Sequence, residues 1–380
     1  MARRSTSSLR RGPAGGVIVP AVAAIAGIYQ AMAIVACWRF RRRSTSAPDP
    51  CLLTPDSCLL TPASILKPVS GVDAGLIPAI ESHSKLRGDY ELLCGVRPGD
   101  PAAGLLAQFP RVRLIECHTQ APNGKVGVLI DLARAARHDV LIVNDADIRV
   151  DPDYLKRVTA PLLDPRVGLV TCLYRAEGST FAARFEALGI ATDFAPSALV
   201  GWLLGLEEFA GGSTLAFRRA DLERFGGFQS IADYLADDYQ LGLRLRRLGL
   251  KCVLSDSIVS THLGGGWGDV WTHQLRWART IRVSNPAGYF TLPVTFATPW
   301  ALIAAITGHW ISASLLAALR LIMAFTAAWV VLRSRDGLRL WPLVPLRDLY
   351  AAAVWCAGLA GRTVVWRGQR LKLDRQGRIR

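Results

Sequence analysis

Residues 17–37 (VIVPAVAAIAGIYQAMAIVAC) carry no charged side chain, and this segment restricts the possible folds of the chain more than any other. An apolar helix needs about 20 residues to cross the hydrocarbon core of a bilayer, and the segment meets that length. The arginine-rich stretch RFRRR follows it, where a signal peptide would have small residues and a cleavage site. The sequence therefore predicts an N-terminal transmembrane anchor within residues 1–43 rather than a cleaved signal peptide.

A second apolar region lies near the other end of the chain. Residues 290–306 and 311–332 are apolar stretches joined at a Gly-His-Trp turn, which predicts a membrane hairpin. Arg320 interrupts the second stretch, and a charge at that depth needs a buried partner or access to the membrane surface. Residues 349–361 are too short to span and predict an interfacial or re-entrant segment, so we treat 287–361 as one membrane region.

The positive charge is concentrated at the two ends of the chain. The formal net charge is +15, and all but one unit of it lies in residues 1–43 and in a basic tail at 362–380. Basic segments next to apolar ones are attracted to anionic membrane surfaces. A nucleic-acid-binding protein would instead carry its basic residues on a folded face, so we predict no nucleic-acid partner. Residues 44–63, rich in Pro, Ser and Thr, predict a linker.

Residues 64–286 alternate between strand-like and helical patterns. The strand-like runs are SILKPV, YELLCGV, RVRLIEC, DVLIVND, VGLVTCLY, STLAFR and KCVLSDSIV. Amphipathic helical patterns such as KVGVLIDLARAARH lie between them. This alternation predicts an α/β domain with a mainly parallel sheet and helices on both faces. In such sheets ligands bind beyond the carboxyl ends of the strands.

Asp145 and Asp147 stand at the end of the buried strand DVLIVND. Because side chains alternate along an extended backbone, both carboxylates project to the same side, with Ala146 opposite. Two such carboxylates repel each other unless a cation lies between them. Mg²⁺ or Mn²⁺ takes one or two carboxylates and completes its shell with water and phosphate oxygens. The pair therefore predicts a divalent metal site, although an isolated D-x-D is more often a solvated loop.

Three further polar residues are expected at the same edge of the sheet. Asp73 follows the first strand and Asp100 follows the second. Lys125 lies in the first turn of a predicted helix, where a phosphate group would find the positive helix terminus. Each of them alone is equally typical of a surface loop.

Two predicted helices carry further candidates. Asp238, beside Asp237, begins one helix, where acids usually complement the helix dipole but where a carboxylate could also act as a general base. His273, Arg276 and Trp277 share one face of a later helix by their i, i+3, i+4 spacing. An arginine there could pair with phosphate oxygens, whereas a basic helix beside the membrane would explain it without any function.

Six short motifs follow one another over residues 65–289: ILKPVSGVD, NDADIRVDPDYL, VGLVTCLYR, GSTLAFRRADLERFGGF, YLADDYQLG and HQLRWARTIR. In order and spacing they resemble the glycosyltransferase family that contains ceramide glucosyltransferase and the bacterial hopanoid-associated glycosyltransferases. The resemblance implies a GT-A (Rossmann-like) fold, a UDP-sugar donor, inversion at the anomeric carbon and a lipid hydroxyl acceptor, ceramide-like or hopanoid.

The functional positions of this family match the chain one by one. Asp100 matches the aspartate expected near the nucleotide, and Asp145 with Asp147 matches the metal and diphosphate site. Asp238 matches the general base, while Arg276 and Trp277 match the end of the (Q/R)-x-x-R-W signature.

The chain departs from the family pattern at the first position of that signature, where His273 stands and Gln274 comes one residue late. A histidine could still donate to a phosphate, with a charge that depends on pH.

The resemblance also implies a location. UDP-sugars are cytosolic and lipid acceptors lie in the bilayer, so the catalytic domain should face the cytoplasm from a multi-pass position in the cell (inner) membrane. The arginines at 333, 335 and 339 agree with a cytoplasmic end there. Two alternatives stay open: a processive polysaccharide synthase, which normally needs more spans, and a non-catalytic membrane scaffold that binds nucleotide sugars. The identity of the sugar is also open.

Overall fold

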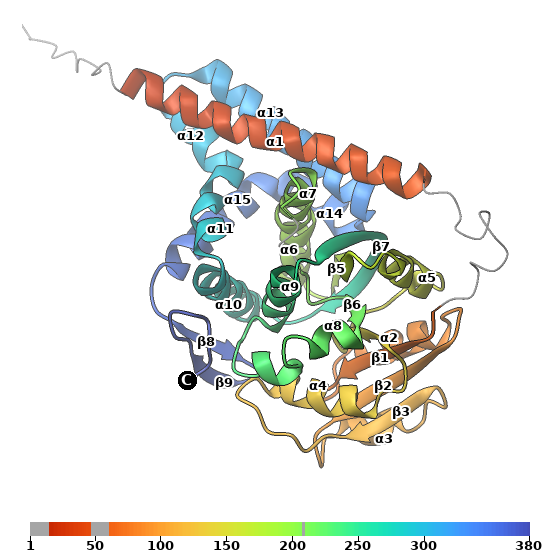
Figure 1. Cartoon of the computed structure of the whole chain (residues 1–380). Coiled ribbons are helices and arrows are strands. Elements are labelled where there is room, and N and C mark those ends of the chain that lie inside the picture. The colour runs from red at the N-terminus through yellow and green to blue at the C-terminus, as the bar shows by residue number, and fades with distance from the viewer. Residues whose placement is uncertain (1–14, 47–60, 207–209) are drawn as a thin grey trace, which may run out of the picture.

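The structure is a computed structural model that describes residues 15–46, 61–206 and 210–380. It contains an α/β domain beside a group of long apolar helices (Figure 1). Most of the predicted linker lies outside the described residues, as do the arginines at 3, 4, 10 and 11.

Seven strands form one sheet in the order β3-β2-β1-β4-β6-β5-β7. Their bounds are Ala63–Pro68 (β1), Tyr90–Val96 (β2), Val112–Glu116 (β3), Val140–Val143 (β4), Val167–Gly178 (β5), Leu215–Arg218 (β6) and Lys251–Leu263 (β7). Strand β6 pairs antiparallel with both neighbours, whereas the other pairs are parallel. The prediction of a mainly parallel α/β sheet is confirmed.

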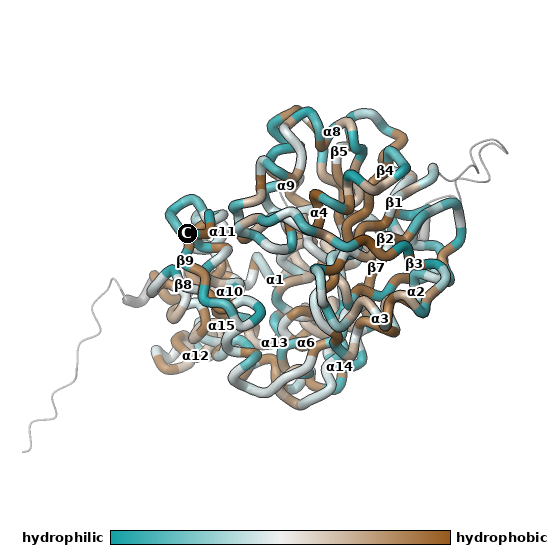
Figure 2. The backbone as a smooth tube through the Cα atoms, turned by 90° about the horizontal axis from the view of Figure 1, so that it is seen from below, coloured by the Kyte–Doolittle hydropathy of each residue, from teal (hydrophilic) through white to brown (hydrophobic). Residues whose placement is uncertain are grey.

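Helices cover both faces of the sheet. Successive side chains of a strand point to opposite faces, so each strand contributes apolar residues to two cores. In β1, Ile65 packs in one core with α2 (Leu76–Ser84), α3 (Ala102–Leu106) and α5 (Tyr154–Thr159). Its neighbour Leu66 packs in the other core with α4 (Gly124–Ala135), α8 (Arg219–Glu223) and α9 (Asp237–Arg247). Figure 2 shows the hydrophobic residues concentrated in the central strands. Because β1 is parallel to both β2 and β4, the carboxyl ends of these three strands share one edge of the sheet.

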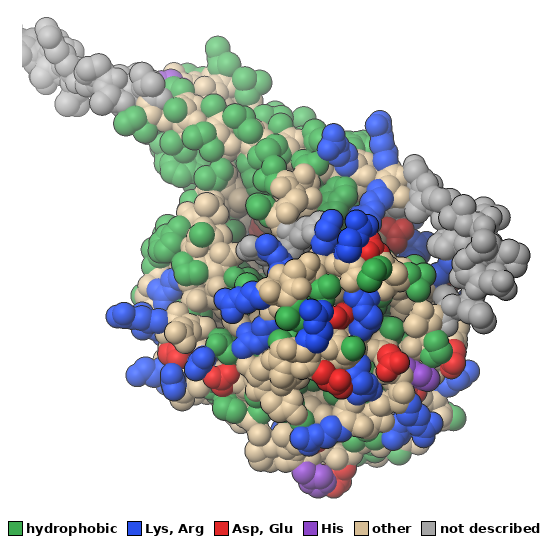
Figure 3. All heavy atoms as spheres, viewed as in Figure 1, with side chains coloured by type: hydrophobic (Ala, Val, Ile, Leu, Met, Phe, Trp, Pro, Cys, Tyr) green, Lys and Arg blue, Asp and Glu red, His purple; other side chains and the backbone are tan. Residues whose placement is uncertain are grey.

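Three apolar helices pack together beyond the sheet: α1 (Gly15–Ser46), α12 (Ala297–Ile306) and α13 (Trp310–Thr326). Hydrophobic side chains cover this end of the molecule, while charged side chains gather over the α/β domain (Figure 3). Large apolar residues such as Ile28, Ile306 and Ile311 are more than half exposed there. An exposed apolar surface of this kind is expected in a bilayer and not in water.

Two helices among the described residues are long and apolar enough to cross a membrane, 18–43 and 310–332. The first arm of the predicted hairpin is broken: residues 286–295, which contain α11 (Pro286–Thr291), and residues 297–306 are bent by 51° to each other. Phe296 lies at the break, with non-helical backbone angles (φ −83°, ψ 82°) between the 3-10 helix Leu292–Thr295 and α12. The bent pair would make a third span if it crosses as one unit.

Arg320 of α13 has buried partners. Its guanidinium donates to Asp348 at 2.6 Å and to Asp193 at 2.6 Å. Asp348 lies on α15 (Val344–Gly358), and Asp193 on a π-helical turn (Ile190–Phe194) between α6 (Phe181–Gly189) and α7 (Ala195–Leu203). Of the two possibilities left open by the sequence, a buried partner is therefore the one that the structure contains.

Residues 362–380, predicted as a basic tail, form a folded unit instead. Strands β8 (Thr363–Trp366) and β9 (Gln369–Lys372) form an antiparallel hairpin beside α10 (Trp267–Ser284) (Figure 1, Figure 2). Val364 and Leu373 pack against Leu235, a residue just before α9. The charge pattern of this segment did not indicate these long-range apolar contacts.

Candidate active site

The loop after β4 carries Asp145 and Asp147, and buried side chains fix its backbone by hydrogen bonds. Lys67, fully buried on β1, donates to the carbonyl oxygens of Asp145 at 2.8 Å and Ile148 at 3.3 Å. Buried Asn144 donates to the carbonyl oxygen of Ser213 at 2.8 Å. Burial lowers the pKa of Lys67 to about 8. Sequence analysis missed Lys67; its one signal was a lysine within an otherwise apolar strand run.

Lys125 joins two acidic segments at this edge. Its ammonium lies 2.8 Å from Asp145 and 3.1 Å from Asp237, and its side chain is 12% exposed. Burial alone would lower its pKa, but the charges of both carboxylates outweigh burial and raise it. The backbone N–H of Lys125 also donates to the side chain of Asn123, which caps α4. Lys125 is thus a charged group at the predicted helix start, although here its ammonium is paired with carboxylates.

Asp238 lies one residue beyond Asp237, half-buried, on the same side as Asp145. A Cβ atom added to Gly212 would be 3.2 Å from Oδ2 of Asp238 and 3.7 Å from Oδ2 of Asp145. The backbone at Gly212 therefore lies close to both carboxylates, and a side chain there would crowd them. Burial raises the pKa of Asp238 to about 6; the charge of Asp237 also raises it and that of Lys125 opposes the shift. Asp238 is then mostly ionised at neutral pH but easily protonated.

Asp147 has different neighbours. Its carboxylate accepts a hydrogen bond from the Thr261 hydroxyl. Burial raises its pKa, and the nearby charge of Asp145 raises it further. A Cβ atom at Gly75 would be 2.8 Å from Cβ of Asp147 and 3.3 Å from Oδ1 of Asp73, so these two aspartates flank the same glycine.

The donor set of Asp145 and Asp147 suits a hard divalent cation that binds substrate phosphates. Asp145 is 44% exposed, and the two carboxylates lie near enough for their charges to interact. Within residues 15–46, 61–206 and 210–380, no group of three or more His, Cys, Asp or Glu side chains is arranged to hold a metal ion. A Mg²⁺-type ion needs only one or two carboxylates, because water and phosphate oxygens complete its shell. The residues present fit such an ion.

Asp73 and Asp100 shape the loops at the same edge. Asp100 accepts from the backbone N–H of Gly71 at 3.0 Å and of Ala102 at 2.9 Å, and so connects the loops after β1 and β2. Asp73 accepts from the N–H of Gly75 at 2.9 Å at the start of α2. In this structure both carboxylates therefore have backbone partners.

Helix α10 carries the signature residues, and a buried acid holds it in place. Glu186 of α6 lies 2.7 Å from Nδ1 of His273 and accepts from Gln274 at 2.8 Å. The His273 ring lies 4.4 Å from the Trp277 ring. Glu186 was missed because it stands in the apolar pattern FAARFEALG, 88 residues before the partner that it binds.

Arg276 lies near enough to the same group of charges to interact with them. Burial lowers the pKa of Arg276, whereas the nearby charges of Asp145, Glu186 and Asp238 raise it. The structure therefore gathers Lys125, Asp145, Asp238 and Arg276 in one electrostatic cluster, which we call the carboxyl-edge site. Asp147 and Asp73 flank Gly75 at the same edge, and His273 and Trp277 lie on α10 with Arg276.

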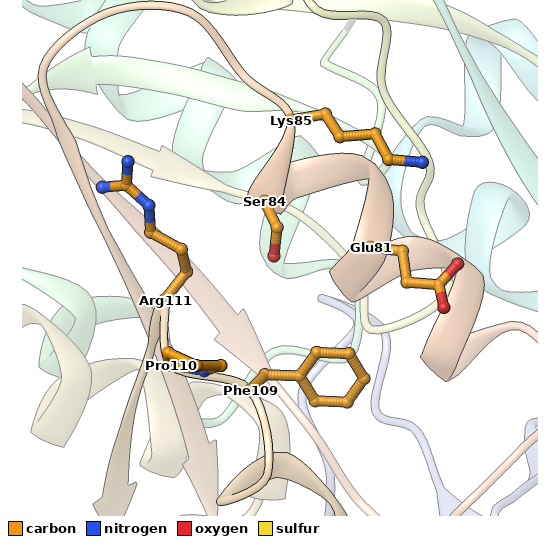
Figure 4. A pocket seen from close by; sticks show the side chains of 6 residues that line it. All are labelled: Glu81, Ser84, Lys85, Phe109, Pro110 and Arg111. Atoms are coloured by element: carbon orange, nitrogen blue, oxygen red, sulfur yellow. The ribbon is translucent and has the colours of Figure 1, made fainter.

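A separate surface pocket of about 470 Å³ lies elsewhere (Figure 4). It is lined by Glu81, Ser84, Lys85, Phe109, Pro110 and Arg111. These residues are at the C-terminal end of α2 and just before β3, and thus at the amino edge of the sheet. The pocket is therefore not part of the carboxyl-edge site.

The fold is that of a GT-A type domain attached to long apolar helices. The mannosyltransferase PcManGT from Pyrobaculum calidifontis, solved in complex with GDP-Man and Mn2+, has a similar fold with a TM-score of 0.51. The alignment covers 88% of this chain and 98% of that chain at 18% identity. At that identity the likeness establishes the fold alone.

The chain belongs to glycosyl transferase family 21, whose family model matches residues 18–379. It is 28% identical over 227 residues to ceramide glucosyltransferase 1 of Caenorhabditis elegans, which is 57% of this chain and 47% of that protein. It is also 28% identical over 202 residues to ceramide glucosyltransferase 3 of the same organism, 50% of this chain and 44% of that protein. The matched part of the chain thus spans about half the length of these curated relatives.

Proposed function

We propose that the protein is a membrane-bound inverting glycosyltransferase that transfers a hexose from a UDP-sugar to the hydroxyl group of a membrane lipid. The observation that carries this proposal is the carboxyl-edge site, where Asp238, Asp145, Lys125 and Arg276 meet at the ligand-binding edge of a GT-A sheet. Membership of glycosyl transferase family 21 supports the reaction class.

The donor would bind with its diphosphate near Asp145. Arg276 supplies a guanidinium that can pair with phosphate oxygens, and Lys125 supplies a second cation once a ligand competes for Asp145. Asp145 and Asp147 would hold a divalent cation such as Mg²⁺ or Mn²⁺, which when bound neutralises charge on the diphosphate leaving group. Asp100 and Asp73 would contribute by fixing the loops around the nucleotide.

The transfer itself needs one base. The acceptor hydroxyl oxygen attacks the anomeric carbon, the bond from that carbon to the phosphate oxygen breaks, and its electron pair leaves with UDP. The hydroxyl proton passes to the carboxylate of Asp238, whose raised pKa makes it a better proton acceptor than an ordinary aspartate. A single displacement of this kind inverts the configuration at the anomeric carbon.

A lipid acceptor is supported by the position of the domain. The α/β domain is joined to apolar helices at both ends, which supports an active edge that works at the bilayer surface. The two curated relatives are ceramide glucosyltransferases by name, which favours a ceramide-like acceptor, with a hopanoid alcohol as the next choice. We further propose a multi-pass protein whose catalytic domain faces the cytoplasm, where UDP-sugars are found.

The test is a transfer assay on membranes that contain the protein. Radiolabelled UDP-glucose, UDP-N-acetylglucosamine and GDP-mannose are each offered with ceramide or with a hopanoid polyol, with and without EDTA. We expect one UDP-sugar to label one lipid, and the labelling to disappear with EDTA. A labelled polymer would instead support a polysaccharide synthase, and no labelled lipid in any pairing would contradict the proposal.

A further inference from the structure

The C-terminal hairpin β8–β9 is fixed between the two elements that carry the proposed catalytic groups. On one side, Arg279 of α10 donates to the carbonyl oxygen of Thr363 at 2.5 Å, and Arg282 donates to the carbonyls of Leu359 and Gly361. Arg279 and Arg282 are one and two helical turns beyond Arg276. The base of the hairpin is thus anchored to the helix that carries Arg276 (Figure 1).

The residues that follow the hairpin form hydrogen bonds with the segment that leads into α9. The N–H of Leu235 donates to the carbonyl of Gly377 at 3.2 Å, and the N–H of Ile379 donates to that of Asp233 at 2.7 Å. Leu235, Val364 and Leu373 form a buried cluster between them. Asp238 follows Leu235 by three residues, so the C-terminal segment links the surroundings of the proposed base with those of Arg276.

The tip of the hairpin has a conformation that its sequence does not favour. Arg367 and Gly368 form the two-residue connection, with φ of 49° and 76°. Two positive φ angles are typical of hairpin turns that prefer Asn-Gly or Gly-Gly, because other side chains crowd the backbone there. Arg367 is one of two residues other than glycine with positive φ among the described residues. Residues held in such sparsely populated conformations cluster at ligand-binding and active sites.

Trp366 packs against the Leu235 cluster beside α9, and the side chain of its neighbour Arg367 is exposed. Its charge is one of the influences that lower the pKa of Arg276, after burial, so the two guanidinium groups lie close enough to repel each other. The Arg367 guanidinium lies over the Trp366 ring, with 5.9 Å from the guanidinium carbon to the ring centroid. Two neighbouring cations are suited to an anion with more than one negative charge.

We propose that Arg367 is a donor-binding residue, which with Arg276 holds the diphosphate of the nucleotide sugar, and that the β8–β9 hairpin forms one wall of the donor site. This inference rests on the proposed function, because it assigns to Arg367 the same diphosphate that Asp145 and Arg276 are proposed to meet. The chemical class of the ligand is a nucleoside diphosphate. The segment 362–380 would then be part of the active site and not a membrane-binding tail.

The experiment measures binding of radiolabelled UDP to the purified full-length protein in detergent at fixed salt. Arg367→Asn removes the charge while keeping a residue that tolerates positive φ, so the turn should survive. Arg367→Lys keeps the charge. Arg370→Asn, an equally exposed arginine on β9 of the same hairpin, is the matched control. Thermal unfolding of each variant checks that the hairpin remains folded.

We expect Arg367→Asn to raise the Kd for UDP about tenfold, the usual effect of losing one charge-assisted hydrogen bond. Arg367→Lys should raise it less, and Arg370→Asn should leave it within about twofold of wild type. A Kd within twofold of wild type for Arg367→Asn would overturn the inference, as would an equal loss in Arg370→Asn. If the wild-type protein binds neither UDP nor GDP, the proposed donor site fails and this inference fails with it.

Discussion

Asp238 is the residue whose ionisation should control the reaction rate. Its pKa is raised to about 6, chiefly by burial, with Asp237 and Asp145 adding to the shift and Lys125 opposing it. A base works only when deprotonated, so activity should be full above this pKa and fall as pH drops through it. We expect kcat/KM to decrease about tenfold per pH unit below about pH 6. Initial rates between pH 5 and 8 test this, and a flat profile down to pH 5 would contradict it.

Lys125 should contribute to stability as well as to binding. It is the shared cation of Asp145 and Asp237, and removing it leaves the largely buried Asp237 carboxylate without its cation, whereas Asp145 is 44% exposed. Removing one partner of a buried ion pair lowers the free energy of unfolding by about 3–5 kcal/mol. We expect Lys125→Met to lower the thermal unfolding temperature clearly, and Lys125→Met with Asp237→Asn to recover part of the loss. Equal unfolding temperatures for Lys125→Met and wild type would show that the ionic pairs have no net effect.

At the scale of elements, a buried ionic group joins the membrane helices to the α/β domain. Arg320 of α13 meets Asp348 of α15, and Asp348 also accepts from the backbone N–H of Thr298 in α12 at 3.0 Å. Arg347 continues the chain of contacts to Gln274 of α10 at 3.1 Å. The arrangement of the apolar helices is therefore tied to the helix that carries Arg276.

Replacing Arg320 should loosen this connection. The Arg320→Met side chain keeps the length but leaves Asp348 and Asp193 buried without their cation, at a cost of about 3–5 kcal/mol. We expect a lower unfolding temperature in detergent and faster proteolysis of the full-length protein. Arg333→Met, which alters an exposed arginine beyond the same helix, is the control and should behave as wild type. Equal stability of the two variants would contradict this account of the apolar helices.

The elements themselves were largely predictable from the sequence. The run YELLCGV is β2 with the bounds that were predicted, because a continuous apolar run in the sequence indicates a buried strand without any distant contact. The meeting of Asp147 with Asp73 followed from the rule that parallel strand ends share one edge, whereas the place of Asp238 beside Asp145 was implied by the family resemblance alone. Lys67 and Glu186 were not predictable, since their partners come from distant segments and a single charge in an apolar pattern does not say what it meets.

For the molecule as a whole, the least predictable part was the C-terminal segment. Its arginines suggested an attraction to lipid headgroups, yet apolar residues at 364 and 373 fold it against residue 235. The break at Phe296 was likewise not evident from hydropathy alone, which averages over a bend. Both features depend on contacts between segments far apart in the chain. Together they make the α/β domain, the apolar helices and the C-terminal hairpin one connected structure around the carboxyl-edge site.

The most direct test of the central claim compares lipid labelling by wild type and Asp238→Asn, with UDP binding measured on the same samples. Asparagine keeps the shape of the side chain but cannot accept the proton at neutral pH. We expect labelling to fall by about 10²–10⁴-fold while the Kd for UDP stays close to wild type. Equal labelling by the two proteins would contradict the role of Asp238 as the base at the carboxyl-edge site.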